Sequence, residues 1–486
     1  MSDRERGWFE VPEVRTWQLT AGAAVVGLAL AAGAVAAAGP WDSGQRKAER
    51  DWAAARSVPG GAHHEIPRPK RPAPAPSAPG VLAALGAPTT KASAERTTPD
   101  DLAGVLAPLL GDPGLGTVRT ACVIDVATGR QLYGKGAADP MTPASTIKIA
   151  TSAAALSALG PDHRIPTTVV ASKDAKELTL VGGGDATLDT AALRTLADRT
   201  ARALRERGVR TVRLAYDTSL YKGPALHPIG PNGNIAPVSA LMVGEGRLGG
   251  TSQAAGPGGE GPTGAADRSG DPAGDAARAF GRLLTERGIN SSATPAPGRP
   301  AAGAEPVAKV LSAPLSALVE RTLTHSDNDI AEALARQTAL ATGEEASFEG
   351  AERAVTRQLT RLKLPLTGAR FADGSGLSRQ DRLSAGLLTA LLARAADPAH
   401  PELRPVLTGL PVAGFSGTLQ TRYTETSPGT GLVRAKTGTL TGVNTLAGTV
   451  VAPDGRLLAF AFLAGNTPSR DVAQPALDRL AAALAS

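Results

Sequence analysis

Cysteine and aromatic residues are nearly absent from this sequence. One cysteine, Cys122, excludes a disulfide within the chain, and its apolar surroundings predict a buried strand residue rather than a reactive thiol. Aromatic residues make up only 3% of the 486 residues, so alanine, leucine and valine must supply most of the packing. Because 42% of the residues are hydrophobic, a chain of this length can bury a large core and form two or more structural units.

Missing motifs narrow the possible chemistry. None of the six histidines belongs to a His-Glu-x-x-His motif, which argues against a zinc peptidase, and we expect no metal and no other cofactor. No Gly-x-Ser-x-Gly elbow is present, so His325 beside Ser326 is not expected to form a Ser-His pair. The formal charge of +6 comes from lysines and arginines scattered among acids, so we expect no nucleic-acid partner.

Charged residues are also missing from residues 16–41. The apolar core of this stretch, 21–35, is long enough to span a bilayer as a helix. Its small-residue end resembles a signal-peptidase site, so residues 1–40 are either a membrane anchor or a cleaved signal peptide. Either would direct the rest of the chain out of the cytoplasm. The proline- and alanine-rich segment 41–97 then predicts an extended stalk.

Folded structure is expected from about residue 98 onward. Two strands around the turn Ala127–Arg130 come first, and Pro143 then opens an alanine-rich helix. The Gly-, Ala- and Pro-rich segment 249–274 is predicted to be a mobile loop. Further strands are predicted at 167–170, 177–181, 209–216, 442–451 and 456–463, and helices at 190–206, 275–287 and a C-terminal stretch that includes Leu477, Leu480 and Leu484.

Three short motifs occur in one order: Ser145-Thr-Ile-Lys148, Ser326-Asp-Asn328 and Lys436-Thr-Gly438. On a helix, residues three apart lie on one face, so the Lys148 amine can take the hydroxyl proton of Ser145. Apolar spacing on both sides of the second motif predicts a junction between two helices. Taken singly, the second and third motifs have structural explanations, with Ser326 as a helix cap and Lys436 as a strand-edge lysine.

A second Ser-x-x-Lys sequence, Ser219 to Lys222, shows how weak one motif is alone. It runs directly into Gly223-Pro224, which is not compatible with a helix, so we interpret it as a coincidence. The ordered set of three motifs is much more specific and indicates an acyl-transferring serine enzyme.

The three motifs resemble those of the D-alanyl-D-alanine carboxypeptidase/endopeptidase family, the low-molecular-mass class C penicillin-binding proteins. The likeness runs from about residue 98 to the C-terminus. In this family, the long gap between Lys148 and Ser326 holds two inserted domains, one nested in the other. Beyond the motifs, the resemblance rests on residues 180–185, 235–241, 373–379, 410–414 and 433–443.

The resemblance implies an α+β fold of the penicillin-binding-protein and serine β-lactamase kind. This fold has an antiparallel sheet flanked by helices, a helical lobe and, in this chain, a large inserted α/β region. The penicillin-binding domain would consist of residues 98–160 and 314–486, with inserted domains at 161–313.

The resemblance also implies a serine DD-peptidase that trims D-alanyl-D-alanine ends of peptidoglycan stem peptides or, as an endopeptidase, cleaves their cross-links. Such an enzyme is acylated by β-lactam antibiotics. Ser145 would attack the peptide carbonyl, and Lys148, kept neutral by burial and by nearby Lys436, would accept its proton. Ser326 would protonate the departing amine, and Asn328 would hold Lys148 and the substrate amide.

The remaining expected roles concern substrate binding. Backbone N–H groups of Ser145 and Thr439 would form the oxyanion hole. Lys436, Thr437 and Thr439 would receive the terminal carboxylate of the substrate, and Gly438 lies between these two threonines in the binding strand.

Two alternatives stay open on the sequence alone. A serine β-lactamase shares the three motifs, although no Glu-x-x-Leu-Asn segment is present to position a deacylating water. A catalytically slow penicillin-binding sensor or scaffold would use the insertion and stalk for protein contacts, and release of D-alanine would distinguish it from an enzyme.

Overall fold

The computed structural model describes residues 99–248 and 266–486. The predicted anchor or signal peptide, the predicted stalk and most of the predicted loop lie outside the described residues. None of the helices in these two described ranges combines the length and the apolar character that a membrane span requires.

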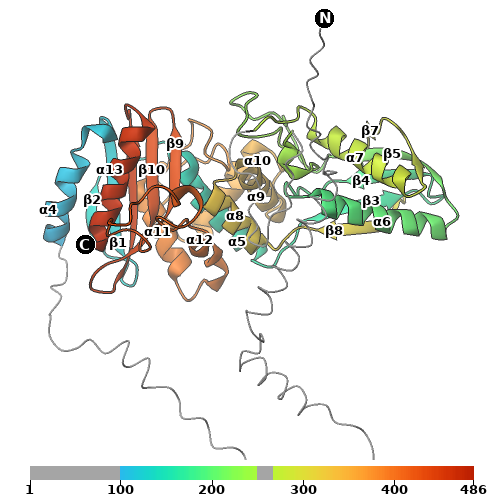
Figure 1. Cartoon of the computed structure of the whole chain (residues 1–486). Coiled ribbons are helices and arrows are strands. Elements are labelled where there is room, and N and C mark those ends of the chain that lie inside the picture. The colour runs from blue at the N-terminus through green and yellow to red at the C-terminus, as the bar shows by residue number, and fades with distance from the viewer. Residues whose placement is uncertain (1–98, 249–265) are drawn as a thin grey trace, which may run out of the picture. The chain divides into compact units, whose positions relative to one another are not determined.

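A five-stranded antiparallel sheet combines strands from the two ends of the described chain (Figure 1). Its strand order is β2-β1-β11-β10-β9, so β11 is central and β9 lies at an edge. The bounds are β1 Val118–Asp125, β2 Gln131–Lys135, β9 Arg434–Leu440, β10 Val443–Val451 and β11 Leu457–Gly465.

Helices cover both faces of this sheet, and β11 shows how one strand serves two cores. Phe460 and Phe462 point into the core under α4 (Pro99–Leu110) and α13 (Arg470–Ala482). Ala459 and Ala461 face the opposite core, because successive side chains of a strand alternate between its faces. That second core is built with α5 Lys148–Leu159, α8 Leu315–His325, α9 Asn328–Ala341, α10 Phe348–Arg361, α11 Ala385–Ala396 and α12 Pro405–Thr408.

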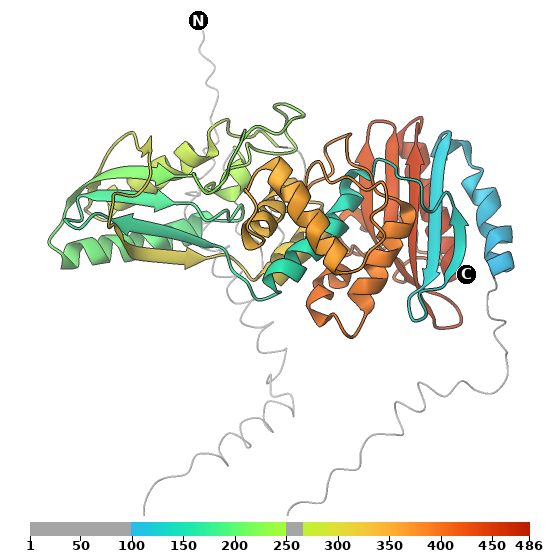
Figure 2. The same ribbon diagram turned by 180° about the vertical axis from the view of Figure 1, so that it is seen from behind.

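A second sheet has six strands, all drawn from residues 166–311, and Figure 2 shows it from behind. Its order is β6-β5-β4-β3-β8, with β7 also paired to β5, and β4 and β5 run parallel while β3 is antiparallel to both its neighbours. Buried leucines and Phe280 of its two helices complete a separate core. The bounds are β3 Pro166–Ala171, β4 Glu177–Val181, α6 Thr190–Glu206, β5 Thr211–Asp217, α7 Pro272–Glu286, β6 Asn290–Ser291, β7 Ala296–Pro297 and β8 Glu305–Leu311.

The predicted elements are confirmed apart from some boundaries. Cys122 is buried in β1, as expected. α7 begins at Pro272, inside the predicted loop, because the Asp271 side chain caps it and proline fits a first helical turn. The C-terminal helix was predicted to include Leu484, but α13 ends at Ala482 and Leu484 lies buried in a following 3₁₀ turn.

Candidate active site

Ser145 lies in a 3₁₀ turn, η2 (Ala144–Ile147), and not in the α-helix that the sequence predicted. The α-helix α5 begins only at Lys148. In a 3₁₀ turn, side chains three residues apart are eclipsed, which explains the close approach of the two catalytic candidates. Lys148 Nζ donates a hydrogen bond to Ser145 Oγ at 2.9 Å, so the predicted pairing forms.

The second Ser-x-x-Lys sequence behaves as expected for a coincidence. Residues 219–222 form no helix, and Lys222 Nζ donates to the backbone carbonyl of Ser219 at 2.7 Å instead of to its hydroxyl. This lysine is exposed, unlike the buried Lys148.

The second motif occupies the predicted junction between two helices. Ser326 ends α8 in the left-handed conformation, with φ 61°, and the Asp327 side chain caps α9 by accepting the N–H of Ile330. Asn328 Oδ1 then accepts a hydrogen bond from Lys148 Nζ at 2.8 Å, and its Nδ2 donates to the carbonyl of Asn234 at 2.9 Å. The structure therefore brings Ser145, Lys148 and Asn328 into one hydrogen-bonded set.

The third motif is held against η2 by a close backbone approach at Gly438. A Cβ atom there would lie 2.1 Å from Thr445 Oγ1 and 2.7 Å from the carbonyl oxygen of Pro143, so only glycine fits. Thr445 Oγ1 also donates to that carbonyl at 2.8 Å. These contacts place β9 next to the turn that carries Ser145.

The side chains of β9 differ in their exposure. Lys436 is fully buried, and its Nζ donates to the carbonyl of Thr437 at 2.8 Å. Thr439 is exposed, with its Oγ1 accepting a 3.3 Å hydrogen bond from Gln474 of α13. The Thr437 hydroxyl donates to Thr418, and neither Thr418 nor Gln474 was identified from the sequence.

The side chains of both lysines of the site, Lys148 and Lys436, are fully buried. Burial lowers the pKa of Lys148 to about 8, although the charges of Asp373, Asp327 and Glu332 oppose this shift. Burial lowers the pKa of Lys436 well below its usual value, and the charge of Lys148 adds to the effect. Burial, the first part of the expected cause, thus lowers the pKa of Lys148, and the contribution of the Lys436 charge stays a prediction.

A third oxygen contacts the amine of Lys148 and was not predicted. The carbonyl of Ser375 accepts a hydrogen bond from Nζ at 2.5 Å. Ser375 belongs to the loop 373–379, a segment that the sequence resemblance included without a role. The next residue, Gly376, has φ +84°, and a Cβ atom there would lie 2.1 Å from the carbonyl oxygen of Ala144, beside Ser145.

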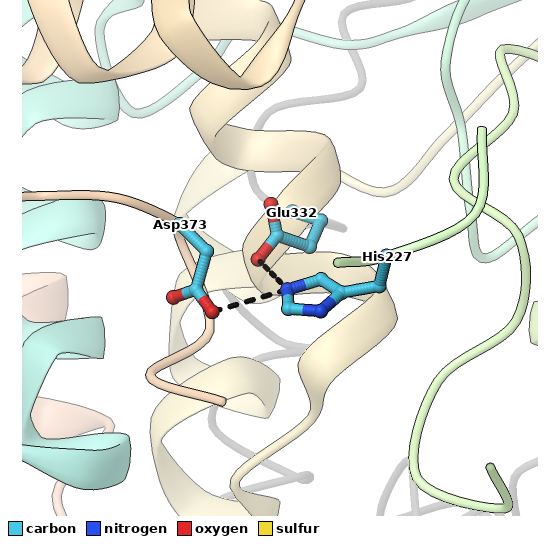
Figure 3. Close-up of side chains that lie close together, drawn as sticks. All are labelled: His227, Glu332 and Asp373. Atoms are coloured by element: carbon cyan, nitrogen blue, oxygen red, sulfur yellow. Dashed lines mark hydrogen bonds and ion pairs between the residues drawn. The ribbon is translucent and has the colours of Figure 1, made fainter. Parts of the chain in front are cut away.

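Two groups of buried side chains have ligand types that metals use. One is His227, Glu332 and Asp373, drawn in Figure 3, and the other is Glu245, Asp327 and Asp329. In the second group, arginines already lie against the carboxylates, as in the 2.9 Å pair of Arg268 and Asp329. In the first, backbone N–H groups donate to Glu332 and Asp373. Hydrogen bonds and arginines therefore already contact carboxylates of both groups.

Comparisons with known proteins identify the family of this chain. The description "D-Ala-D-Ala carboxypeptidase 3 (S13) family" matches residues 102–261 and 256–485. The chain is 38% identical over 440 residues to "Carboxypeptidase DacB" of Mycolicibacterium smegmatis, covering 86% of this chain and 90% of that protein. It is 31% identical over 451 residues to "D-alanyl-D-alanine carboxypeptidase" of an Actinomadura species, covering 77% and 82% of the two chains.

A solved structure resembles the fold. Penicillin binding protein 4 (dacB) from Haemophilus influenzae matches with a TM-score of 0.64 and 22% identity, covering 79% of this chain and 98% of that one. The expected penicillin-binding-protein fold is confirmed. The chain belongs to the D-Ala-D-Ala carboxypeptidase 3 (S13) family, and its predicted class, a serine-type D-Ala-D-Ala carboxypeptidase, is confirmed with it.

Replacing Gly376 with alanine tests the contact between the loop 373–379 and η2, the turn that carries Ser145. We expect Gly376→Ala to slow acylation by a penicillin at least about 100-fold, because its Cβ displaces the turn beside Ser145. Gly129→Ala is the matched control, since this glycine also has positive φ, +68°, but nothing lies within 4 Å of its Cβ position. Stopped-flow or gel-based labelling measures both rates. Equal rates in the two variants would contradict the proposed contact.

Proposed function

We propose that Ser145 forms the acyl-enzyme of a DD-peptidase that acts on D-alanyl-D-alanine ends of peptidoglycan stem peptides. The observation that carries this proposal is the hydrogen-bonded set of Ser145, Lys148 and Asn328 in a chain of the D-Ala-D-Ala carboxypeptidase family. A nucleophile 2.9 Å from an amine with a pKa of about 8 is activated at near-neutral pH. Trimming of single stems and cleavage of cross-linked stems use the same acylation step.

The chemical steps follow from this geometry. Lys148 takes the hydroxyl proton as Ser145 attacks the carbonyl carbon of the penultimate D-alanine. Backbone N–H groups of Ser145 and Thr439 stabilise the negative charge on the carbonyl oxygen. Ser326 passes a proton to the departing D-alanine amine, and Asn328 orients both Lys148 and the substrate amide. Water then hydrolyses the acyl-enzyme.

Lys436 acquires its role when the substrate binds. Among the described residues it has no ion pair with a carboxylate, and its buried amine donates to the carbonyl of Thr437. The terminal carboxylate of the substrate would supply the missing negative charge, with Thr437 and Thr439 as hydrogen-bond donors. A charged Lys436 then repels the proton on Lys148, so substrate binding itself favours the basic form of Lys148.

β-Lactams are proposed as acylating inhibitors of the same serine. Support comes from the solved structure of the Haemophilus influenzae protein "complexed with novel beta-lactam", which matches this chain with a TM-score of 0.62 and 22% identity. A β-lactam carries both the amide carbonyl that Ser145 attacks and the carboxylate that Lys436 receives.

The proposed domain organisation follows the two sheets. Residues 98–160 and 314–486 form the penicillin-binding domain, since the five-stranded sheet takes its strands from both. Residues 161–313 are the inserted region, because the six-stranded sheet is contained in it. Residues 1–40 are proposed as an anchor or signal peptide and 41–97 as a stalk, which would place the enzyme outside the cytoplasm, where its substrate is.

The two Ser-x-x-Lys sequences provide a direct test of the nucleophile. Ser145→Ala is expected to abolish fluorescent penicillin labelling and release of D-alanine from a pentapeptide. Ser219→Ala is expected to keep both within about twofold, since the amine of Lys222 contacts a carbonyl and not the Ser219 hydroxyl. Mass spectrometry of the labelled peptide locates the acylated residue. Labelling that survives Ser145→Ala would overturn the assignment.

The pKa of Lys148 predicts how the rate depends on pH. The value of kcat/KM should rise with pH as free Lys148 loses its proton, with a midpoint near the pKa of about 8. Lys148→Arg should be inactive, because arginine keeps its proton. Lys436→Met removes the charge that the bound substrate stabilises, so the kcat profile should move to higher pH while that of kcat/KM changes less. Active Lys148→Arg would identify another group as the base.

The proposed location is tested with a reporter. A reporter fused after Arg96 should be active only in an extracytoplasmic assay, and N-terminal sequencing of the mature protein separates a retained anchor from a cleaved signal peptide. Activity of the fusion in the cytoplasm would contradict a substrate in the cell wall.

A further inference from the structure

The loop that supplies the carbonyl to Lys148 is wrapped around two buried carboxylates. Asp373 accepts backbone N–H groups of Ser375, Gly376 and Ser378 at 3.1, 2.6 and 2.6 Å. Glu332 of α9 accepts the N–H groups of Gly374 and Ser375, both at 3.0 Å. The position of the Ser375 carbonyl is therefore determined by where these carboxylates lie.

A histidine from a distant part of the chain holds one of these carboxylates. His227 lies between β5 and α7, and its Nε2 is 3.1 Å from Asp373 Oδ2 and 3.9 Å from Glu332 Oε1 (Figure 3). The imidazole is buried and packs edge-on against Phe348, with ring centroids 5.3 Å apart. It thus joins the segment before α7 to the loop at the catalytic lysine.

The hydrogen bonds of His227 indicate which nitrogen carries the proton. Nδ1 accepts the backbone N–H of Ile229 at 3.3 Å, so it has no proton of its own in this arrangement. Nε2 must then carry the proton and donate it to Asp373. Both ring nitrogens therefore have a hydrogen-bond partner.

We propose that His227 is a positioning residue for the catalytic base, acting through Asp373 and the Ser375 carbonyl on the amine of Lys148. The proposal rests on the assignment of Lys148 as the base. It gives the long segment between β3 and β8 a role in the chemistry, because a side chain from that segment determines the geometry of a lysine on α5.

Two effects are expected when the Nε2 donor is lost. The loop loosens, so the Ser375 carbonyl no longer holds the Lys148 amine next to Ser145. In addition, the charge of Asp373 is less well compensated, and Lys148 keeps its proton to higher pH. The hydrogen bond from His227 and that from Gly376 hold the pKa of Asp373 low although burial raises it.

Other charged groups also act on the pKa of the Lys148 amine. Glu332 and Asp327 lie on and before α9, and Lys436 lies on β9. Asp381 follows the loop, and burial together with the charge of Asp373 raises its pKa to about 10. Arg336 of α9 faces Glu332. None of these groups changes in a substitution of His227.

Asparagine and glutamine provide a matched pair of variants at this position. His227→Gln places an amide N–H where Nε2 was and keeps the bond to Asp373, whereas His227→Asn is too short for it and retains only the acceptor for Ile229. We expect His227→Gln to stay within about twofold of the parent in acylation rate. His227→Asn should lose about tenfold in kcat with little change in KM, and its rising pH limb should move up by about half a unit or more.

A control variant distinguishes the loss of the His227–Asp373 hydrogen bond from a general loosening of the contact between the inserted segment and α9. Gln337 of α9 donates its hydrogen bond to the carbonyl of Gly183, at 2.7 Å, and not to the loop, so Gln337→Met should leave the pH profile unchanged. Melting temperatures confirm that all variants fold. Identical rates and pH profiles for His227→Asn and His227→Gln would overturn the inference. Failure of the unmodified enzyme to be acylated at Ser145 would instead overturn the proposed function.

Discussion

The removal of one ammonium group from water is the constraint on which the site depends. Lys148 is fully buried, and burial is the main cause of its lowered pKa. A buried amine is tolerated only where oxygen atoms accept its hydrogens, and here a hydroxyl, an amide and a backbone carbonyl do so. These three oxygens come from three separate segments of the chain. The folding of each segment therefore contributes to the acid-base chemistry.

Much of this site could be predicted from the sequence. Ser145, Lys148 and Asn328 were identified by motif order and by resemblance, and the structure joins their side chains by hydrogen bonds. The roles of Ser326, Thr437 and Thr439 in catalysis and binding stay predictions. Most strands and helices were also predicted, because alternating or helical apolar spacing is local information. The strand at 177–181 and the helix at 190–206 have the predicted bounds.

The features that were missed share a physical reason. The Ser375 carbonyl is a backbone atom, so no residue type indicates its role, and His227 meets Asp373 only through the tertiary fold. The 3₁₀ turn at Ser145 was predicted as α-helix because both conformations bring residues three apart together. The pKa of Lys148 depends on burial and on carboxylates contributed by distant segments, which motif spacing does not reveal.

The five-stranded sheet has a consequence for how the enzyme is made. β1 pairs along its whole length with β11, the last strand of the described residues, so the sheet cannot close until residues up to Gly465 are available. The six-stranded sheet, by contrast, takes its strands from residues 166–311 and can form earlier during synthesis. The long closure between β1 and β11 makes late folding steps slow. The turn that carries Ser145 thus gains its β9 neighbour only after the whole inserted segment has been made.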